Sequence, residues 1–397
     1  MQQLDGTIRS YPWGSRTMMA RLQGRPCPTE RPEAELWFGA HPMCPSTVAG
    51  RSLLEVIEED PEGCLGSRVA ERFGSSLPFL LKILAAEEPL SLQAHPSLEQ
   101  AQEGFARENA AGIDLTAPQR NYRDANHKPE LAVALTEFTA MAGFRPLAAT
   151  RDLLRSLECP ALERYIAMID TEHATDAAEE ESLRALLTTW ITIPAGVREE
   201  LLAAVMEAVE RRGERGDWTD EVLRNIATLA ERYPGDSGIL GALLLNHVTL
   251  QPGEAIHLAA GQLHAYIHGL GVEIQANSDN VLRGGLTSKY VDVPELVRVL
   301  DFHSLENPRN TPELDEDHHR WTYQVPVPDF LLHRVPEAQD TLIDEDGPVI
   351  AMCTGGTVRL DNGAETVDLA PGEAAWIPAK DPAVRASGGG ELFIATA

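Results

Sequence analysis

Lysine is scarce in this sequence of 397 residues. Only four lysines, Lys82, Lys128, Lys289 and Lys380, stand against 29 arginines. Lysine can shift its pKa and transfer protons, whereas the guanidinium of arginine stays charged. A chain that so strongly prefers arginine therefore keeps lysine where the ammonium itself is useful. Three of the four lysines fall in the segments that carry the chemical motifs below, so we treat them as candidate site residues.

Features of several other protein classes are also missing. The five cysteines have irregular spacing and no C-x-x-C pair, which argues against a disulfide framework or a thiolate zinc site and favours a reducing cytoplasm. No run approaches the roughly 20 apolar residues that span a bilayer, and the first ten residues lack the apolar core of a signal peptide. The formal charge of -28 argues against nucleic acid or an anionic membrane as partner. A phosphorylated substrate would need a locally basic site.

The N-terminal quarter carries strand signals. Up to Pro96 the chain reads as short strands broken by Pro, Gly and Ser, including residues 35–39, 79–84 and 90–95. We therefore expect this part to be β structure.

Helical signals appear in two places. Ser97 and Gln100 form a capping-box pattern that predicts a helix to about Glu108. Strand character returns over 128–144, and from 148 to 235 apolar residues recur at helical spacing. Strands then resume, so we expect three domains in four segments. They are a catalytic β domain over 1–147 and 236–310, a helical domain of residues 148–235 inserted in it, and a C-terminal β barrel of residues 311–397.

The last third contains an internal repeat. Residues 250–255, Leu-Gln-Pro-Gly-Glu-Ala, recur as Leu-Ala-Pro-Gly-Glu-Ala at 369–374, which is 119 residues later. A strand, a Pro-Gly turn and a strand used twice indicate two copies of a small β-barrel unit, although two unrelated turns would also match. His264 of the first copy aligns with Ala383, so a metal site at His264 would leave the second barrel metal-free.

Gln93 and His95 are the first candidate ligands. Residues two apart on a strand share a face, so these side chains can converge on one ion. Imidazole is a good zinc ligand, and an amide oxygen is an acceptable one. A glutamine two residues before a histidine is common in proteins. By itself this pattern is more typical of two surface side chains than of a metal site.

A second motif is Asn126-His127-Lys128-Pro129-Glu130. Pro129 favours an extended backbone, so Lys128 and Glu130 would share a face. A carboxylate there would offset metal charge. A solvent-exposed turn explains the motif equally well.

The third motif is a Pro-Gly turn followed by a strand, a glycine and His264, the way cupin barrels place an inward histidine. His264 is therefore the favoured ligand, and His257 and His268 are taken as ordinary histidines. Further along, Glu273 and Gln275 alternate onto one face of a strand. Arg283 and Lys289 then flank a glycine-rich turn where backbone can approach an anion closely, with a solvated loop as the alternative.

Together these residues resemble the type I phosphomannose isomerases. Six motifs occur in family order between residue 11 and about residue 292, with a weaker echo in the C-terminal barrel. They are Tyr11-Pro12-Trp13-Gly14-Ser15, Ala34-Glu35-Leu36-Trp37, Pro78-Phe79-Leu80-Leu81-Lys82, Gln93-Ala94-His95-Pro96, Asn126-His127-Lys128-Pro129-Glu130, and Ser278-Asp279-Asn280-Val281 leading to Gly285-Leu286-Thr287. One departure is Pro12, where the family often has alanine. The helical block looks divergent, so no functional residue is carried over there.

The resemblance implies a fold that is mainly β with an α insertion, namely tandem cupin (jelly-roll) barrels plus an inserted helical domain. It implies a monomer in the cytoplasm with one Zn2+ per chain. The four protein ligands would be Gln93, His95, Glu130 and His264.

The implied reaction interconverts mannose 6-phosphate and fructose 6-phosphate through an enediol, so it needs a base and a group that stabilises the oxyanion. Glu273 is the first choice of base, because a dry site can raise a carboxyl pKa towards neutrality. Lys128 is the second choice, and Lys82 would assist ring opening. Arg283 would stabilise the enediolate or the phosphate. Substrate contacts are expected from Trp13, Ser91, Tyr266, Asp279 and Lys289.

Three other functions remain open at this point. The chain could isomerise another aldose phosphate, or bind a sugar phosphate without catalysis. It could also be a metal cupin of another class, such as a dioxygenase. The last fits less well, since Gln93 and Glu130 beside two histidines, with basic residues nearby, suit a polyol phosphate better than O2 chemistry with iron.

Overall fold

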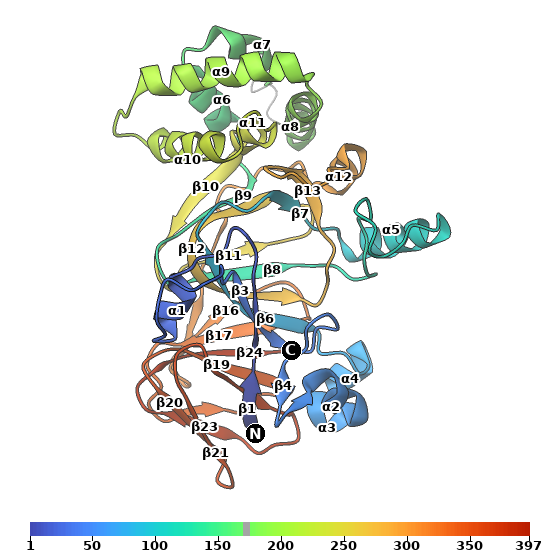
Figure 1. Ribbon diagram of the computed structural model, residues 1–397, viewed down its shortest axis with the longest axis vertical. Helices are drawn as coiled ribbons and strands as arrows, with labels where there is room; N and C mark the ends of the chain where they lie inside the picture. The colour runs from blue at the N-terminus through green and yellow to red at the C-terminus, as the bar shows by residue number, and fades with distance from the viewer. Residues whose placement is uncertain (170–174) are drawn as a thin grey trace.

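The computed structural model describes residues 1–169 and 175–397. It is elongated, with two β regions stacked end to end and a group of helices covering one end (Figure 1). The structure is mainly β with some helices, which confirms this coarser part of the predicted fold class. Across the described residues, no helix has the length and apolar character needed to cross a membrane.

The first β region is an eleven-stranded sheet built around one long strand, β12 (His264–Ala276). β12 pairs antiparallel with four strands, and the register places Lys82 opposite Glu273, Glu130 opposite Gln275 and Gln93 opposite His264. One strand thus brings three distant motifs together. The other strands are β2 (Thr7–Arg9), β3 (Glu35–Gly39), β6 (Phe79–Ala86), β7 (Leu92–Ala94), β8 (Glu130–Ala134), β9 (Phe138–Phe144), β10 (Leu245–Leu250), β11 (Ala255–Leu258), β13 (Leu282–Gly285) and β14 (Arg309–Asn310).

The second β region contains a nine-stranded and a four-stranded sheet. The larger sheet has the order β15-β16-β17-β24-β19-β22-β1-β4-β5, so the first strand of the chain lies beside β22 with Gln2 opposite Trp376. No sequence signal anticipated this pairing. The strands are β1 (Gln2–Asp5), β4 (Thr47–Val48), β5 (Arg51–Ser52), β15 (Glu313–Asp315), β16 (Arg320–Tyr323), β17 (Leu331–Val335), β18 (Thr341–Ile343), β19 (Val349–Gly355), β20 (Val358–Asp361), β21 (Thr366–Leu369), β22 (Ala374–Ile377), β23 (Val384–Ser387) and β24 (Glu391–Thr396).

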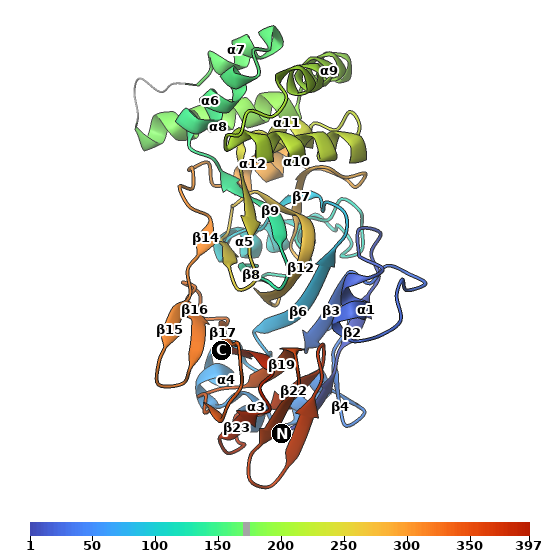
Figure 2. The same cartoon turned by 90° about the vertical axis from the view of Figure 1, so that its left-hand side faces the viewer.

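Helices α6 to α11 form the cap at the end far from the N-terminus (Figure 2). The chain leaves the sheet after β9 and returns at β10, and these two strands pair with each other. Helices α6 to α11, which we call the helical block together with their connections, thus lie between two neighbouring strands. The apolar faces of the helical block, with Trp190 and Leu187 fully buried, make one core with the adjoining sheet. The helices are α6 (Leu147–Ser156), α7 (Glu163–Ile166), α8 (Asp176–Ile191), α9 (Ala195–Arg212), α10 (Thr219–Arg232) and α11 (Gly238–Ala242), with the 3-10 helix η1 (Pro160–Leu162).

The remaining helices test the local predictions. α5 (Leu98–Ala110) begins with the expected capping box of Ser97 and Gln100, and α12 (Val293–Val299) follows the glycine-rich turn. The expectation of strands alone up to Pro96 was wrong, because four short helices lie there. The Asp60-Pro61 start of one of them, where Asp60 accepts a hydrogen bond from the Gly63 amide, is an ordinary helix-start signal that was missed. They are α1 (Met18–Leu22), α2 (Leu53–Glu59), α3 (Pro61–Leu65) and α4 (Ser67–Phe73).

Candidate active site

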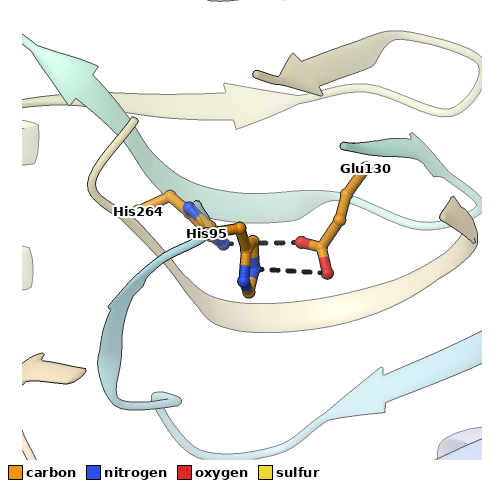
Figure 3. A group of neighbouring side chains, drawn as sticks. All are labelled: His95, Glu130 and His264. Atoms are coloured by element: carbon orange, nitrogen blue, oxygen red, sulfur yellow. Dashed lines mark ion pairs between the residues drawn. The ribbon is translucent and has the colours of Figure 1, made fainter. Parts of the chain in front are cut away.

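Three buried side chains from three strands converge inside the first β region (Figure 3). Glu130 begins β8, His264 begins β12 and His95 follows β7. The Nε2 atom of His95 lies 3.4 Å from Oε1 of Glu130, and that of His264 lies 3.4 Å from Oε2. The potential ligand atoms all lie within 4.8 Å of one another. Among the residues that the structure describes, this is the one group of three or more His, Cys, Asp or Glu side chains with metal-site geometry.

The hydrogen bonds around this group suit a metal ion. Nδ1 of His95 lies 2.7 Å from the carbonyl oxygen of Asn280, and Nδ1 of His264 lies 2.9 Å from that of Gln262. Because Nδ1 must donate to a carbonyl, each Nε2 carries a free lone pair. Both Nε2 atoms and one oxygen of Glu130 are buried without a hydrogen-bond partner. Burial lowers the pKa of His95 to about 4, which keeps the ring in the neutral form that binds metals. The donor set therefore fits zinc.

Gln93 lies beside this group. It is opposite His264 in the β7–β12 pair and opposite Arg283 in the β7–β13 pair. Its side chain lines the cavity that Glu130 also lines. The fourth-ligand role of Gln93 stays a prediction.

We call His95, Glu130 and His264 the metal group. A cavity of about 510 Å3 is lined by Glu130 of this group. All nine residues expected to act in catalysis or substrate binding line it, although they come from segments far apart in the chain. Three of the four lysines of the protein are among them, whereas Lys380 is exposed and pairs with Asp60 at 2.7 Å. The nine are Trp13, Lys82, Ser91, Lys128, Tyr266, Glu273, Asp279, Arg283 and Lys289.

Glu273 lies in the wall of the cavity with both carboxylate oxygens occupied. The ammonium of Lys82 and the hydroxyl of Tyr266 each donate to it at 2.8 Å. Burial raises the pKa of Glu273, although Lys82 opposes this effect. Burial disfavours the ammonium of Lys82, but the carboxylates of Glu273 and Glu35 together raise its pKa above the ordinary value. Glu273 is thus a carboxylate with increased basicity, and Lys82 holds its charge.

Lys128 lines the cavity and contacts the metal group. Its ammonium is 2.8 Å from an oxygen of Glu130. Burial disfavours ionisation of Glu130, but Lys128 and the two histidines hold its pKa well below the usual range. The predicted common face of Lys128 and Glu130 is confirmed by this contact.

A group of three cations, Arg123, Arg283 and Lys289, lines the same cavity. Within residues 1–169 and 175–397, none of the three has an ion-pair partner, although the chain carries a formal charge of -28. Burial and the neighbouring Arg123 lower the pKa of Arg283, and burial together with both arginines lowers that of Lys289. Such mutual repulsion is relieved by an anion.

Sequence reasoning missed several residues of this site. Arg123 was overlooked because it lies just before the Asn126–Glu130 motif, in a loop without a spacing signal. Its amide donates to the Asn280 side chain at 2.7 Å, which ties this loop to the segment that orients His95. Glu35 and Trp37 stood in a quoted motif without a role. Glu35 accepts a 2.6 Å hydrogen bond from the Trp37 ring and lies 4.0 Å from the ammonium of Lys82.

The glycine-rich turn was expected to let backbone approach an anion closely. Two of its amides, those of Leu286 and Thr287, donate to the carboxylate of Asp236. The glycines instead allow close packing, because a Cβ on Gly285 would lie 2.6 Å from the Cα of Gly238. The side chains of the cation group, rather than these amides, are left to bind an anion.

Comparison with known proteins gives a consistent result. A family described as phosphomannose isomerase type I, catalytic domain, matches residues 1–147. The mannose-6-phosphate isomerase of Escherichia coli strain K12 is 39% identical over 99% of this chain and 98% of its own length. Among solved structures, a lysine-to-alanine variant of phosphomannose isomerase from Salmonella typhimurium has a TM-score of 0.91 and 38% identity, covering 100% of this chain and 99% of its own. A mannose 6-phosphate isomerase bound with zinc and yttrium has a TM-score of 0.90, 38% identity and the same coverage.

Proposed function

This chain belongs to the type I phosphomannose isomerases, and we propose that it interconverts D-mannose 6-phosphate and D-fructose 6-phosphate with one zinc ion per chain. The observation that carries the proposal is one cavity that is lined both by Glu130, which belongs to the buried group with His95 and His264, and by the cation group. A metal site next to an anion site suits a sugar phosphate, since the reacting carbons and the phosphate lie at opposite ends of the open-chain molecule.

His95, Glu130 and His264, with Gln93 as fourth ligand, would hold the zinc. When bound, zinc supplies a positive charge that polarises the C1 or C2 carbonyl or orients the hydroxyls. The orphaned Nε2 atoms support this set, because two neutral imidazoles leave the ion with net positive charge after Glu130 binds.

Glu273 is the proposed base that moves the proton between C1 and C2. Its raised pKa increases its affinity for a proton, and Tyr266 and Lys82 fix its orientation. Burial raises the pKa of Tyr266 well above its usual value, so this hydroxyl stays a hydrogen-bond donor. Lys128, which already contacts Glu130, is the alternative base, and Lys82 is the proposed partner in ring opening.

The cation group is the proposed phosphate site, with Arg283 placed between phosphate and enediolate. The observation in favour is that these three cations line one cavity and have no carboxylate partner among the residues that the structure describes. Asp279, Ser91, Tyr266 and Trp13 are proposed to contact the sugar. Trp13 stacks on Tyr11, with ring centroids 5.6 Å apart, and so offers an aromatic face at the cavity wall.

We propose two cupin barrels for the two β regions, with domains over 1–147 together with 236–310, over 148–235 and over 311–397. The matching Pro-Gly turns support this division, since Gly253 and Gly372 adopt φ angles of +90° and +82°. A monomer in the cytoplasm is the proposed state, and the five free thiols fit a reducing compartment.

A coupled assay with mannose 6-phosphate, run beside other aldose phosphates, tests the function. The proposal expects mannose 6-phosphate to give the highest kcat/KM, with loss of activity on chelation and recovery with zinc. Preference for another aldose phosphate would move the chain to a different isomerase reaction. Tight binding of hexose 6-phosphates without turnover would favour a binding protein instead.

A further inference from the structure

The helical block touches the turn that carries two of the proposed phosphate ligands. The contact is made by Asp236, in the connection between α10 and α11. One carboxylate oxygen accepts hydrogen bonds from the amides of Leu286 at 2.9 Å and Gly238 at 2.7 Å, and the other accepts from the amide of Thr287 at 3.2 Å. A single side chain therefore joins the insertion to the turn between Arg283 and Lys289.

The 284–287 turn has a backbone conformation that needs support from its neighbours. Gly285 has a φ of +132° and Leu286 a φ of +53°, a region that a branched side chain rarely adopts. The two backbones also pack without room for a methyl group, because a Cβ on Gly238 would lie 2.7 Å from the amide nitrogen of Leu286. The amides at 286 and 287 point into the carboxylate, so their orientation depends on Asp236.

The same connection also contacts a second segment that lines the cavity. The guanidinium of Arg232 pairs with Glu88, and the hydroxyl of Tyr233 donates to the carbonyl of Pro89 at 2.7 Å. Arg232, Tyr233, Glu88 and Pro89 all line the cavity. Residues 232–238 thus contact both the segment that leads to the metal ligands and the turn that carries the cations.

We propose that Asp236 is a positioning residue for phosphate binding: it fixes the 284–287 turn so that Arg283 and Lys289 direct their charges at the phosphate of the substrate. On this account the helical block supports the phosphate site, while the strands and loops of the first β region support the metal site. The inference rests on the proposed function, because it takes the cation group to be the phosphate site.

Three variants separate positioning from simple destabilisation. Asp236→Ala removes all three hydrogen bonds. Asp236→Asn keeps the oxygen that Leu286 and Gly238 share and loses the bond to Thr287. Gly238→Ala pushes against the turn from the helical side without changing any charge. Asp60→Asn is the matched control, since Asp60 also accepts from a backbone amide, that of Gly63 at 3.1 Å, in the other β region.

The measurements are the KM for mannose 6-phosphate, the affinity for inorganic phosphate by calorimetry, and the zinc content. Asp236→Ala and Gly238→Ala are expected to raise KM and the phosphate dissociation constant together, by at least about ten-fold. For Asp236→Asn, both constants should lie between those of the parent and those of the other two variants. The zinc content should stay at one per chain in the parent and in every variant. A purely structural role would lower the melting temperature and leave phosphate affinity unchanged in the folded protein.

Parent-like phosphate affinity in folded Asp236→Ala and Gly238→Ala would overturn the inference. If Asp236→Ala does not fold, parent-like phosphate affinity in Asp236→Asn and Gly238→Ala would overturn the inference in the same way. A parent chain that binds phosphate but does not isomerise mannose 6-phosphate would defeat the proposed function, whereas the calorimetric comparison would still test Asp236.

Discussion

The two β regions share a turn but differ in what they enclose. In the first, Gly253 donates to the carbonyl of Ala134, and in the second, Gly372 donates to that of Cys353, at 2.8 Å in both cases. Glu254 and Glu373 each accept a 2.8 Å hydrogen bond from the amide three residues earlier. The backbone therefore forms the same turn, with the same hydrogen bonds, in both β regions.

The interiors are different. The first region surrounds the metal group together with charged residues such as Lys82 and Glu273. The second packs apolar side chains, including Val349, Leu360 and Ile394, into an apolar core. The comparison teaches that the strands and turns supply a stable frame, whereas the inward side chains decide whether the frame holds a site or a core.

The largest expected effect removes the metal from the first region. His264→Ala gives this position the residue with which it aligns in the second region. Zinc content should fall from one to near zero, and kcat/KM should drop by at least about a thousand-fold, because several kcal/mol of charge stabilisation is lost. Metal analysis and the coupled assay measure this. His268→Ala, an exposed histidine on the same strand, is the control and should change neither.

The next largest effect distinguishes loss of the catalytic base from loss of the metal. Glu273→Gln keeps the shape of the side chain but cannot take a proton. We expect kcat to fall by about 10²–10⁴-fold with zinc still bound. Exchange of the C2 proton with solvent, followed by NMR, should stop. Continued exchange would exclude Glu273 as base and favour Lys128.

A core substitution in the second region should affect stability alone. Leu360 is fully buried among apolar side chains of that region. Leu360→Ala should lower the free energy of unfolding by about 2–5 kcal/mol. Below the melting transition, kcat and KM should match the parent. A fall in kcat of the folded protein would show that the second region contributes to catalysis.

Removing one cation should weaken substrate binding more than turnover. Arg123→Ala leaves Arg283 and Lys289 in place, so KM should rise by about 10- to 100-fold, the range for losing a charge-assisted hydrogen bond. Steady-state kinetics give the split between KM and kcat. Arg68→Ala, an arginine at the other end of the molecule, serves as control.

The smallest effect tests the equivalence of the two turns. Glu254→Gln and Glu373→Gln each replace the carboxylate that accepts the turn hydrogen bond. Each should cost about 1 kcal/mol of unfolding free energy, since the net worth of such a bond is of this order. Equal values from denaturant titration would support duplication of one unit, and a clear inequality would contradict it.

The sequence was most informative where the chemistry depends on short spacing. Lys128 and Glu130 share a face because a strand alternates, and the helical block was visible in its apolar spacing. Contacts between segments far apart in the chain could not be predicted from the sequence. β1 pairs with a strand more than 360 residues away, and the amide partners of Asp236 depend on how the insertion docks on the sheet. Arg123 was missed for the same reason, since a loop places it.

The central claim is that one zinc ion, held by His95, Glu130 and His264, is required for isomerisation. The most direct test is to strip the metal, add zinc back in steps, and follow mannose 6-phosphate turnover at each step. The account predicts activity that rises linearly and stops at one equivalent per chain, with no recovery in His264→Ala. Full turnover in the metal-free protein would contradict it.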